Sequence, residues 1–237
     1  AAVLQFLKNK YPKRKYSYRF VLHPETIGSI TYLSKFGAQL KKNMICGFNL
    51  SCVGDERHYS IVKSPNGNTL ADKALSAALF HKSNFLEYTF LERGSDERQY
   101  CSPGFRLPLC TFCKTKFGEF PEYHTNADNF DLVTEKGLRD SLDIMKLIIN
   151  VFENCLYPTY TVKCEPQLGK RNLYKNTSIK TNNEGNQNTK NCRMNLLTYS
   201  DGENTLFDIS RITNIPLKDL YEEAILLINN GLLFNKD

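Results

Sequence analysis

Apolar runs of strand length alternate with apolar stripes of helical spacing along most of this chain. Strands that alternate with helices predict an α/β fold, in which helices cover both faces of a mostly parallel sheet. The run over 44–53 is nearly continuous, as in a strand that is buried on both faces. In full, the pattern predicts helices over 1–10, 27–40, 69–81 and 134–155, and strands over 15–22, 44–53, 59–62, 88–91 and 107–112.

The end of the chain differs in character. Residues 158–195 are polar, and 176–191 are dominated by Asn, Thr, Lys and Gly, a composition typical of loops and linkers. Apolar stripes then predict one helix over 205–213 and a second over 216–230, with a turn at Asn214 between them. We therefore predict an α/β part over 1–157, a polar connecting segment over 158–195 and a small helical module over 196–237.

Composition excludes several classes of protein. The apolar share of 41% and the aromatic share of 12% are those of a chain with a packed core, not of a disordered chain. No apolar run approaches the roughly 20 residues that span a bilayer, and the apolar start lacks the basic region and cleavage site of a signal peptide. We therefore expect a soluble, cytoplasmic protein with no membrane partner.

The eight cysteines and the net charge of +6 each have a structural interpretation. Several cysteines fall in apolar runs, and the Cys-x-x-Cys pair at 110–113 lies in a predicted strand instead of at the helix N-terminus that redox chemistry favours. The lysine-rich patches are typical of a solvated surface, because Tyr16 and Tyr18 beside them alternate into a predicted strand. Glu222 and Glu223 would repel phosphates from the second C-terminal helix. Nucleic acid is therefore not the expected partner.

The residues with the clearest chemical potential lie at strand ends and in loops. His124 follows a polar loop and shortly precedes Asp128, and neutral imidazole is a good zinc ligand when a nearby carboxylate fixes its tautomer. Glu25 lies where the predicted 15–22 strand ends. Carboxylates and a histidine in such places are the usual components of a hydrolytic zinc site in an α/β fold.

These residues also carry a family resemblance. The Gly94-Ser95-Asp96 loop, the aromatic Tyr100 and the Tyr-His-Thr-x-x-Asp-Asn motif at 123–129 resemble the second half of the co-catalytic zinc aminopeptidases. That clan includes bacterial leucyl aminopeptidase, aminopeptidase Y and the glutamate carboxypeptidases. From about 1 to 237 the chain resembles a bacterial branch with an aminopeptidase-like core and a winged-helix C-terminus. The segments that carry this second resemblance are 24–29, 52–55, 96–104 and 164–170.

The resemblance implies a metal-binding role for three residues. His124 would be a zinc ligand, and Asp128 would support the site from outside the ligand set. Glu25 would be either the general base or itself a zinc ligand. Family members have two adjacent glutamates for these two roles, whereas Glu25 follows Pro24 and precedes Thr26.

The resemblance also implies a substrate pocket beside this site. Asp96, Arg98 and Tyr100 would face the substrate, and Arg98 and Tyr100 would hold a carboxylate or an oxyanion through charge-assisted hydrogen bonds. An Asx-type turn at Asp96 is the structural alternative.

The implied cofactor is zinc, as one or two ions. Where the family has an aspartate for the second metal, this chain has Ser51, and serine is a poor zinc ligand. The apolar helical start has no N-cap residue, so we expect a preceding segment, which would supply the ligands missing upstream of Ala1.

The sequence thus predicts a zinc-dependent, aminopeptidase-like hydrolase that acts on the N-terminus of a peptide or a related amide. The alternative is a non-catalytic binding or scaffold protein on the same fold, linked to surface polysaccharide biosynthesis, as this branch is; the single glutamate and Ser51 favour it. The C-terminal module resembles the winged helix of that branch, and we expect it to contact a protein partner. A sheet deprived of its first strands would expose an apolar edge, so we expect the chain alone to be unstable or to form a homo-oligomer.

Overall fold

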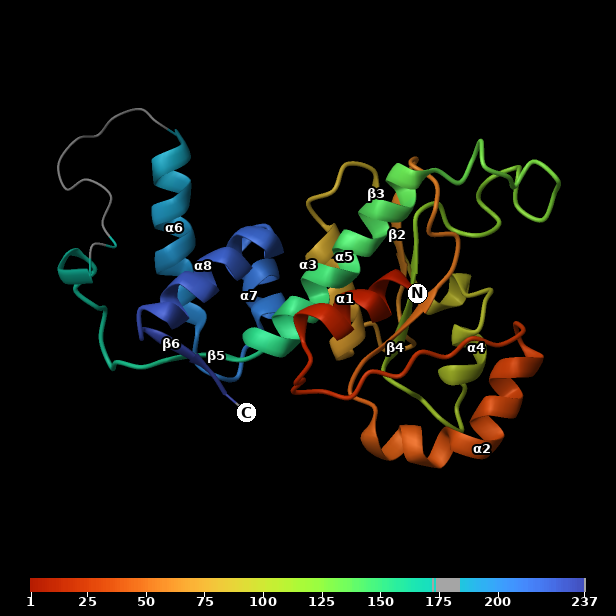
Figure 1. Cartoon of the computed structure of the whole chain (residues 1–237), viewed down its shortest axis with the longest axis horizontal. Helices are drawn as coiled ribbons and strands as arrows, with labels where there is room; N and C mark the ends of the chain where they lie inside the picture. The colour runs from red at the N-terminus through yellow and green to blue at the C-terminus, as the bar shows by residue number, and fades with distance from the viewer. Residues whose placement is uncertain (172, 174–183, 237) are drawn as a thin grey trace. The chain divides into compact units, whose positions relative to one another are not determined.

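In the computed structural model, which describes residues 1–171, 173 and 184–236, the chain divides into two units, Ala1–Ile148 and Ile149–Asp237 (Figure 1). The division falls inside the long helix α5 (Glu135–Asn154), whose first turn is capped by Thr134: its hydroxyl accepts the Gly137 N–H at 2.9 Å. None of the described helices is long and apolar enough to cross a membrane.

The first unit is built on a mixed sheet with the strand order β1-β4-β2-β3. β1 (Gly47–Leu50) is parallel to β4 (Leu109–Cys113), and β2 (Tyr59–Val62) is parallel to β3 (Phe85–Tyr88), but β2 is antiparallel to β4. The predicted mostly parallel sheet is thus a mixed one. Because the link between β1 and β2 is short, the chain reverses there, whereas a parallel connection needs a crossover of a dozen or more residues.

Helices lie on both sides of this sheet, with α3 and α5 on one side and α2 and α4 on the other in Figure 1. α3 packs against β2 and β4 and begins with a capping box, in which Thr69 and Asp72 satisfy each other's backbone N–H groups. The helices besides α5 are α1 (Ala2–Lys10), α2 (Ile27–Asn43), α3 (Leu70–Leu79), the 3₁₀ turn η1 (Phe90–Glu92) and α4 (Glu97–Tyr100). The side chains with essentially no exposure include Ile61, Val62, Ala74, Leu75, Leu79, Cys110 and Phe112.

The strand predicted over 15–22 is wrong. This segment has no strand partner and runs along α2, where the Arg19 guanidinium donates to the Tyr32 hydroxyl at 3.1 Å and to Gln39 Oε1 at 3.4 Å. The alternation of polar and apolar residues therefore does not mark a strand, and its last apolar side chains, Phe20, Val21 and Leu22, are exposed. Because Tyr16 and Tyr18 are not in a strand, one of the arguments against a nucleic-acid partner no longer holds.

Two further strand predictions need correction. β1 is an edge strand and is not buried on both faces, and Leu50 at its end is 48% exposed. The strand predicted over 88–91 lies earlier, as β3, because Thr89 and Glu92 form a capping box that starts η1 instead.

The second unit contains a helix–turn–helix followed by a small β-ribbon. α7 (Leu206–Thr213) begins with a capping box between Thr205 and Asp208 and ends at Asn214 in the left-handed conformation, with φ of 53°. α8 (Leu217–Asn229) follows Pro216 and is succeeded by Gly231 with φ of 68°. The ribbon pairs β5 (Pro158–Tyr160) with β6 (Leu233–Asn235) in antiparallel fashion. This arrangement is that of a winged-helix domain.

The predicted polar connecting segment over 158–195 contains regular structure. It includes β5, the 3₁₀ turn η2 (Gly169–Arg171) and much of α6 (Glu184–Tyr199), which packs against α8. Half of the loop predicted over 176–191 lies in α6, and its residues 176–183 lie outside those that the structure describes.

The acidic face assigned to the second C-terminal helix is only partly exposed. Glu222 faces solvent, but Glu223 is buried and forms an ion pair with Arg193 of α6. Only Glu222, and not both glutamates, is therefore exposed to repel phosphates from this helix.

Candidate hydrolytic site

The carboxyl ends of β1 and β4 lie side by side. Leu50 is in register with Phe112, and the pairing continues past both strands through the Lys114 N–H, which donates to the Cys52 carbonyl at 2.9 Å. The loop from Lys114 to Thr134, which carries His124, leaves from this edge. Ligand sites in α/β sheets are usually found at such strand ends.

Glu25 lies in a sharply strained turn. Thr26, the next residue, has φ of 64° and ψ of −70°, and the Ile27 N–H donates to the Glu25 carbonyl at 2.8 Å. These features define a classic γ-turn, which is rare and is a strong outlier for a β-branched residue. The Glu25 carboxylate is exposed and makes no hydrogen bond or ion pair with the described residues.

Asp96 and Arg98 contact this turn directly. The first carboxylate oxygen of Asp96 accepts the Thr26 N–H at 2.8 Å and the Ser29 hydroxyl at 2.9 Å. The Arg98 guanidinium donates to the Thr26 hydroxyl at 3.0 Å and to the Ser95 carbonyl at 3.0 Å. Arg98 is otherwise exposed, and its other terminal nitrogen makes no hydrogen bond with a described residue.

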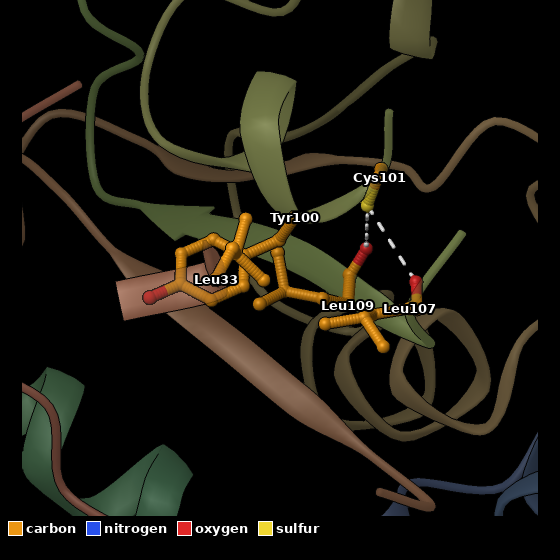
Figure 2. Close-up of a cluster of buried hydrophobic side chains, with 5 residues drawn as sticks. All are labelled: Leu33, Tyr100, Cys101, Leu107 and Leu109. Atoms are coloured by element: carbon orange, nitrogen blue, oxygen red, sulfur yellow. Dashed lines mark hydrogen bonds between the residues drawn. The ribbon is translucent and has the colours of Figure 1, made fainter. Parts of the chain in front are cut away.

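Tyr100 is placed in the core, not in an open pocket. It is 8% exposed and belongs to a buried cluster with Leu33, Cys101, Leu107 and Leu109 (Figure 2). Within this cluster, the Cys101 thiol donates to the carbonyls of Leu107 and Leu109.

The Tyr100 hydroxyl reaches toward the turn at Glu25. It lies 2.9 Å from Nε2 of His23, whose Nδ1 lies 3.7 Å from the second carboxylate oxygen of Asp96. Burial first, and then the charge of Asp96, raises the pKa of Tyr100 to about 12. The phenol therefore stays neutral and serves as a hydrogen-bonding partner of His23.

Glu97 is an organising residue that the sequence reasoning missed. It is 1% exposed, and one carboxylate oxygen accepts the N–H groups of Gly94 at 2.7 Å and Ser95 at 3.0 Å. The other oxygen accepts the Thr111 hydroxyl at 2.9 Å and the Asn49 side-chain amide at 3.1 Å. The sequence offered one signal for it, which was a polar residue, Asn49 or Thr111, inside each of two apolar strands. Buried polar side chains require hydrogen-bonding partners, so these two residues indicated a buried polar group elsewhere in the chain.

His124 is held in an exposed loop. Its backbone is left-handed, with φ of 59°, its ring stacks on Tyr123 with the centroids 3.9 Å apart, and neither ring nitrogen hydrogen-bonds to a described residue. Next to it, the Glu122 carboxylate accepts two bonds from the Arg57 guanidinium, at 2.6 and 3.0 Å.

The segment after β1 also fixes both ends of the His124 loop. Asp55 accepts the Thr115 N–H at 2.8 Å and the Thr115 hydroxyl at 2.6 Å near the start of the loop. At the end of the loop, the Thr134 N–H donates to the Gly54 carbonyl at 2.9 Å, and its hydroxyl donates to Glu56 at 2.6 Å. The chain that follows β1 therefore anchors both ends of the loop that carries His124.

Electrostatic influence shows which candidate residues come together. Burial raises the pKa of the Cys52 thiol, its bond with Ser51 lowers it, and the charges of Asp128, Asp55 and Glu25 raise it further. Burial also raises the pKa of Tyr123, where the additional influences include Glu25, which raises it, and Arg98, which lowers it. The charges of Glu25 and Asp128 therefore act on Cys52, and those of Glu25 and Arg98 act on Tyr123, the residue on which His124 stacks.

Three of the residues described above have strained backbone conformations. Thr26, Cys52 and His124 have φ of 64°, 50° and 59°, and residues other than glycine rarely adopt such values. Each such residue costs about 1–3 kcal/mol and is typically retained at functional sites.

The donor chemistry available here fits part of a zinc site. The exposed imidazole of His124 and the exposed carboxylate of Glu25 are ligand types that zinc accepts. The described residues contain no group of three or more His, Cys, Asp or Glu side chains that could hold a metal ion. Asp96 has both carboxylate oxygens directed at the turn, so it is a poor candidate for a further ligand.

Comparison with known proteins gives consistent relatives for both units. Residues 1–155 match a family described as a domain of unknown function (DUF4910), and residues 156–235 match the winged helix-turn-helix. A relative from Clostridium acetobutylicum carries the provisional name of a polysaccharide biosynthesis protein with an aminopeptidase-like domain. It is 38% identical over 223 residues, which are 93% of this chain and 50% of the relative.

A solved structure from the same organism, provisionally named a peptidase, is also similar. It is 34% identical, with a TM-score of 0.78, and the match covers 98% of this chain and 51% of that one. This chain therefore spans about half the length of the relatives that it matches.

Proposed function

The chain belongs to the DUF4910 family, and on that premise we propose that it carries part of the active site of a zinc-dependent, aminopeptidase-like hydrolase. The observation that supports this most is that the charge of Glu25 acts on Tyr123, the residue on which the His124 ring stacks. Both side chains are exposed, both have uncommitted polar atoms, and each lies in or beside a backbone turn under strain.

Each residue would have a defined task. His124 would be a zinc ligand, and Asp128 would act on the site from outside the ligand set. Zinc bound there would supply Lewis acidity, which makes a water molecule lose its proton near neutral pH and polarises a carbonyl. Glu25 would take the proton from that water, a role worth roughly 10²–10⁴-fold in rate, or would itself be a ligand.

The Arg98 guanidinium would bind the substrate. One of its terminal nitrogens holds the Thr26 hydroxyl, and the other remains available for a carboxylate or an oxyanion. The substrate class would be a peptide with a free N-terminus or a related amide, and further zinc ligands would come from outside this chain. All eight cysteines are free, which supports action in the reducing cytoplasm.

Zinc content tests the proposal first. Metal-free protein is incubated with zinc, dialysed and subjected to elemental analysis, with His124→Ala as the variant and His81→Ala as the matched control, because His81 is also an exposed histidine beside an aromatic ring. We expect zinc in the wild type and in His81→Ala but not in His124→Ala. Equal zinc in all three proteins would contradict the assignment of His124.

Hydrolysis of aminoacyl substrates tests the reaction. This chain and the full-length Clostridium relative are assayed with zinc, and Glu25→Gln is introduced in this chain and at the aligned position of the relative. We expect turnover that is reduced at least about 100-fold by the substitution. Turnover that is unaffected by it would remove Glu25 from the mechanism.

A second function deserves the same assays. Ser51 lies at the end of β1, where the zinc aminopeptidases have an aspartate, and Glu25 has no adjacent glutamate. Both departures favour a binding or scaffold protein, for which the polysaccharide association of the Clostridium relative provides a candidate class of ligand. A glycan or peptide that binds but is never cleaved would support this second function.

A further inference from the structure

The turn that presents Glu25 depends on contacts from another loop. A classic γ-turn at a threonine is unfavourable by itself, so the surrounding structure must hold it in place. The three side-chain contacts to the residues that form and follow this turn come from the 94–98 loop, which is itself fixed on Glu97.

Asp96 makes the two contacts that define the geometry. By accepting the Thr26 N–H at 2.8 Å, it satisfies the donor at the apex of the turn, and by accepting the Ser29 hydroxyl at 2.9 Å, it ties the same oxygen to the first turn of α2. Its other oxygen lies 3.7 Å from His23 on the opposite side of Glu25 in the sequence. Asp96 thus bridges the residues before and after Glu25.

Burial argues against direct contact of Asp96 with a substrate. Its side chain is only 13% exposed, and both oxygens face the 23–29 segment. This differs from the role expected from the sequence, in which Asp96 faced the substrate. Arg98, which is exposed, remains the candidate for that contact.

We propose that Asp96 is a positioning residue: it holds the strained turn at Thr26 and thereby directs the Glu25 carboxylate toward the site of His124. The inference rests on the proposed function, because Glu25 must serve the reaction for its direction to matter. Without the Asp96 carboxylate, the turn would relax to a common backbone conformation and the Glu25 carboxylate would leave its place.

The test compares Asp96→Ala with Asp96→Asn. The asparagine keeps one oxygen that can accept the Thr26 N–H and the Ser29 hydroxyl, so it is the conservative variant. Asp131→Ala is the control, because Asp131 is exposed and outside the proposed machinery. Hydrogen exchange at the Thr26 amide measures whether the turn is held, and it requires neither zinc nor turnover.

We expect exchange at the Thr26 amide to accelerate at least about tenfold in Asp96→Ala and to remain near the wild-type rate in Asp96→Asn and Asp131→Ala. In steady-state hydrolysis, Asp96→Ala should lower kcat by about 10- to 100-fold and leave KM within about twofold, because a displaced base impairs the chemical step. Asp96→Asn should restore most of kcat.

Two results would overturn the inference. Unchanged exchange at the Thr26 amide in Asp96→Ala would show that the turn does not need the carboxylate. A raised KM with unchanged kcat would assign Asp96 to substrate binding instead. If the wild type hydrolyses nothing, the proposed function fails, and the exchange data alone then decide whether Asp96 holds the turn.

Discussion

Replacing Glu97 with glutamine tests the central claim about how the 94–98 loop is held. Four donors converge on the buried carboxylate, the N–H groups of Gly94 and Ser95 on one oxygen and the side chains of Asn49 and Thr111 on the other. Glutamine has nearly the same shape, but only one of its terminal atoms accepts hydrogen bonds. Its NH₂ group must therefore face two donors.

The magnitude follows from the bonds that are lost. A hydrogen bond to a charged group contributes about 1.5–3 kcal/mol, so losing two of them should lower the free energy of unfolding by about 3–6 kcal/mol. For a chain of this size that corresponds to a fall in Tm of roughly 10 °C. Hydrogen exchange of the β4 amides is the suitable assay, because it reports the stability of the first unit specifically.

Two controls make the result interpretable. Glu119→Gln changes a carboxylate that is 52% exposed and should alter stability by less than about 0.5 kcal/mol. Thr111→Val, combined with Glu97→Gln, removes one of the two facing donors, so the double variant should be less destabilised than the sum of the single ones by about 1 kcal/mol. A loss below about 1 kcal/mol for Glu97→Gln would refute this account of the loop.

Three other outcomes are expected. Arg57→Ala removes the exposed ion pair with Glu122, so stability should fall by less than about 1 kcal/mol while amide exchange in the loop around Glu122 accelerates; unchanged exchange would contradict the role of the pair. Burial raises the pKa of Asp201, but neighbouring N–H groups outweigh it and keep that pKa low, so its contribution to stability is present above about pH 4 and is lost as pH falls further. Urea titrations at several pH values should therefore show Asp201→Asn losing less stability than wild type on acidification. Glu223→Ala leaves the buried Arg193 unpaired and should cost about 3–5 kcal/mol in urea unfolding; a cost under 1 kcal/mol would show that the pair is dispensable.

Elements with strong local signals could be predicted from the sequence. The helices that begin after Thr69, Thr134 and Thr205 were all expected within a residue or two of their observed ends, because capping residues and apolar stripes act within a few residues of each other. The second helix of the C-terminal pair likewise follows Pro216 and stops before Gly231. Such signals do not depend on distant parts of the chain.

Only part of the candidate site could be predicted from the sequence. Glu25, Arg98, His124 and Asp128 were selected as chemically apt residues, and their roles stay predictions. No pattern next to Glu97 in the sequence marked it, because the signal lay in Asn49 and Thr111, its partners from two distant strands. Its importance depends on burial, which only packing determines.

By itself, the sequence determined the class of fold, the position of most helices and the chemical character of the candidate residues. The tertiary structure alone decided that 15–22 lies along α2 instead of joining the sheet, that β1 is an edge strand, and that Asp96 faces a turn instead of a substrate pocket. The physical reason is the range of the forces involved. Capping and amphipathic spacing are properties of neighbouring residues, whereas strand order and the burial of a carboxylate depend on which distant segments come into contact.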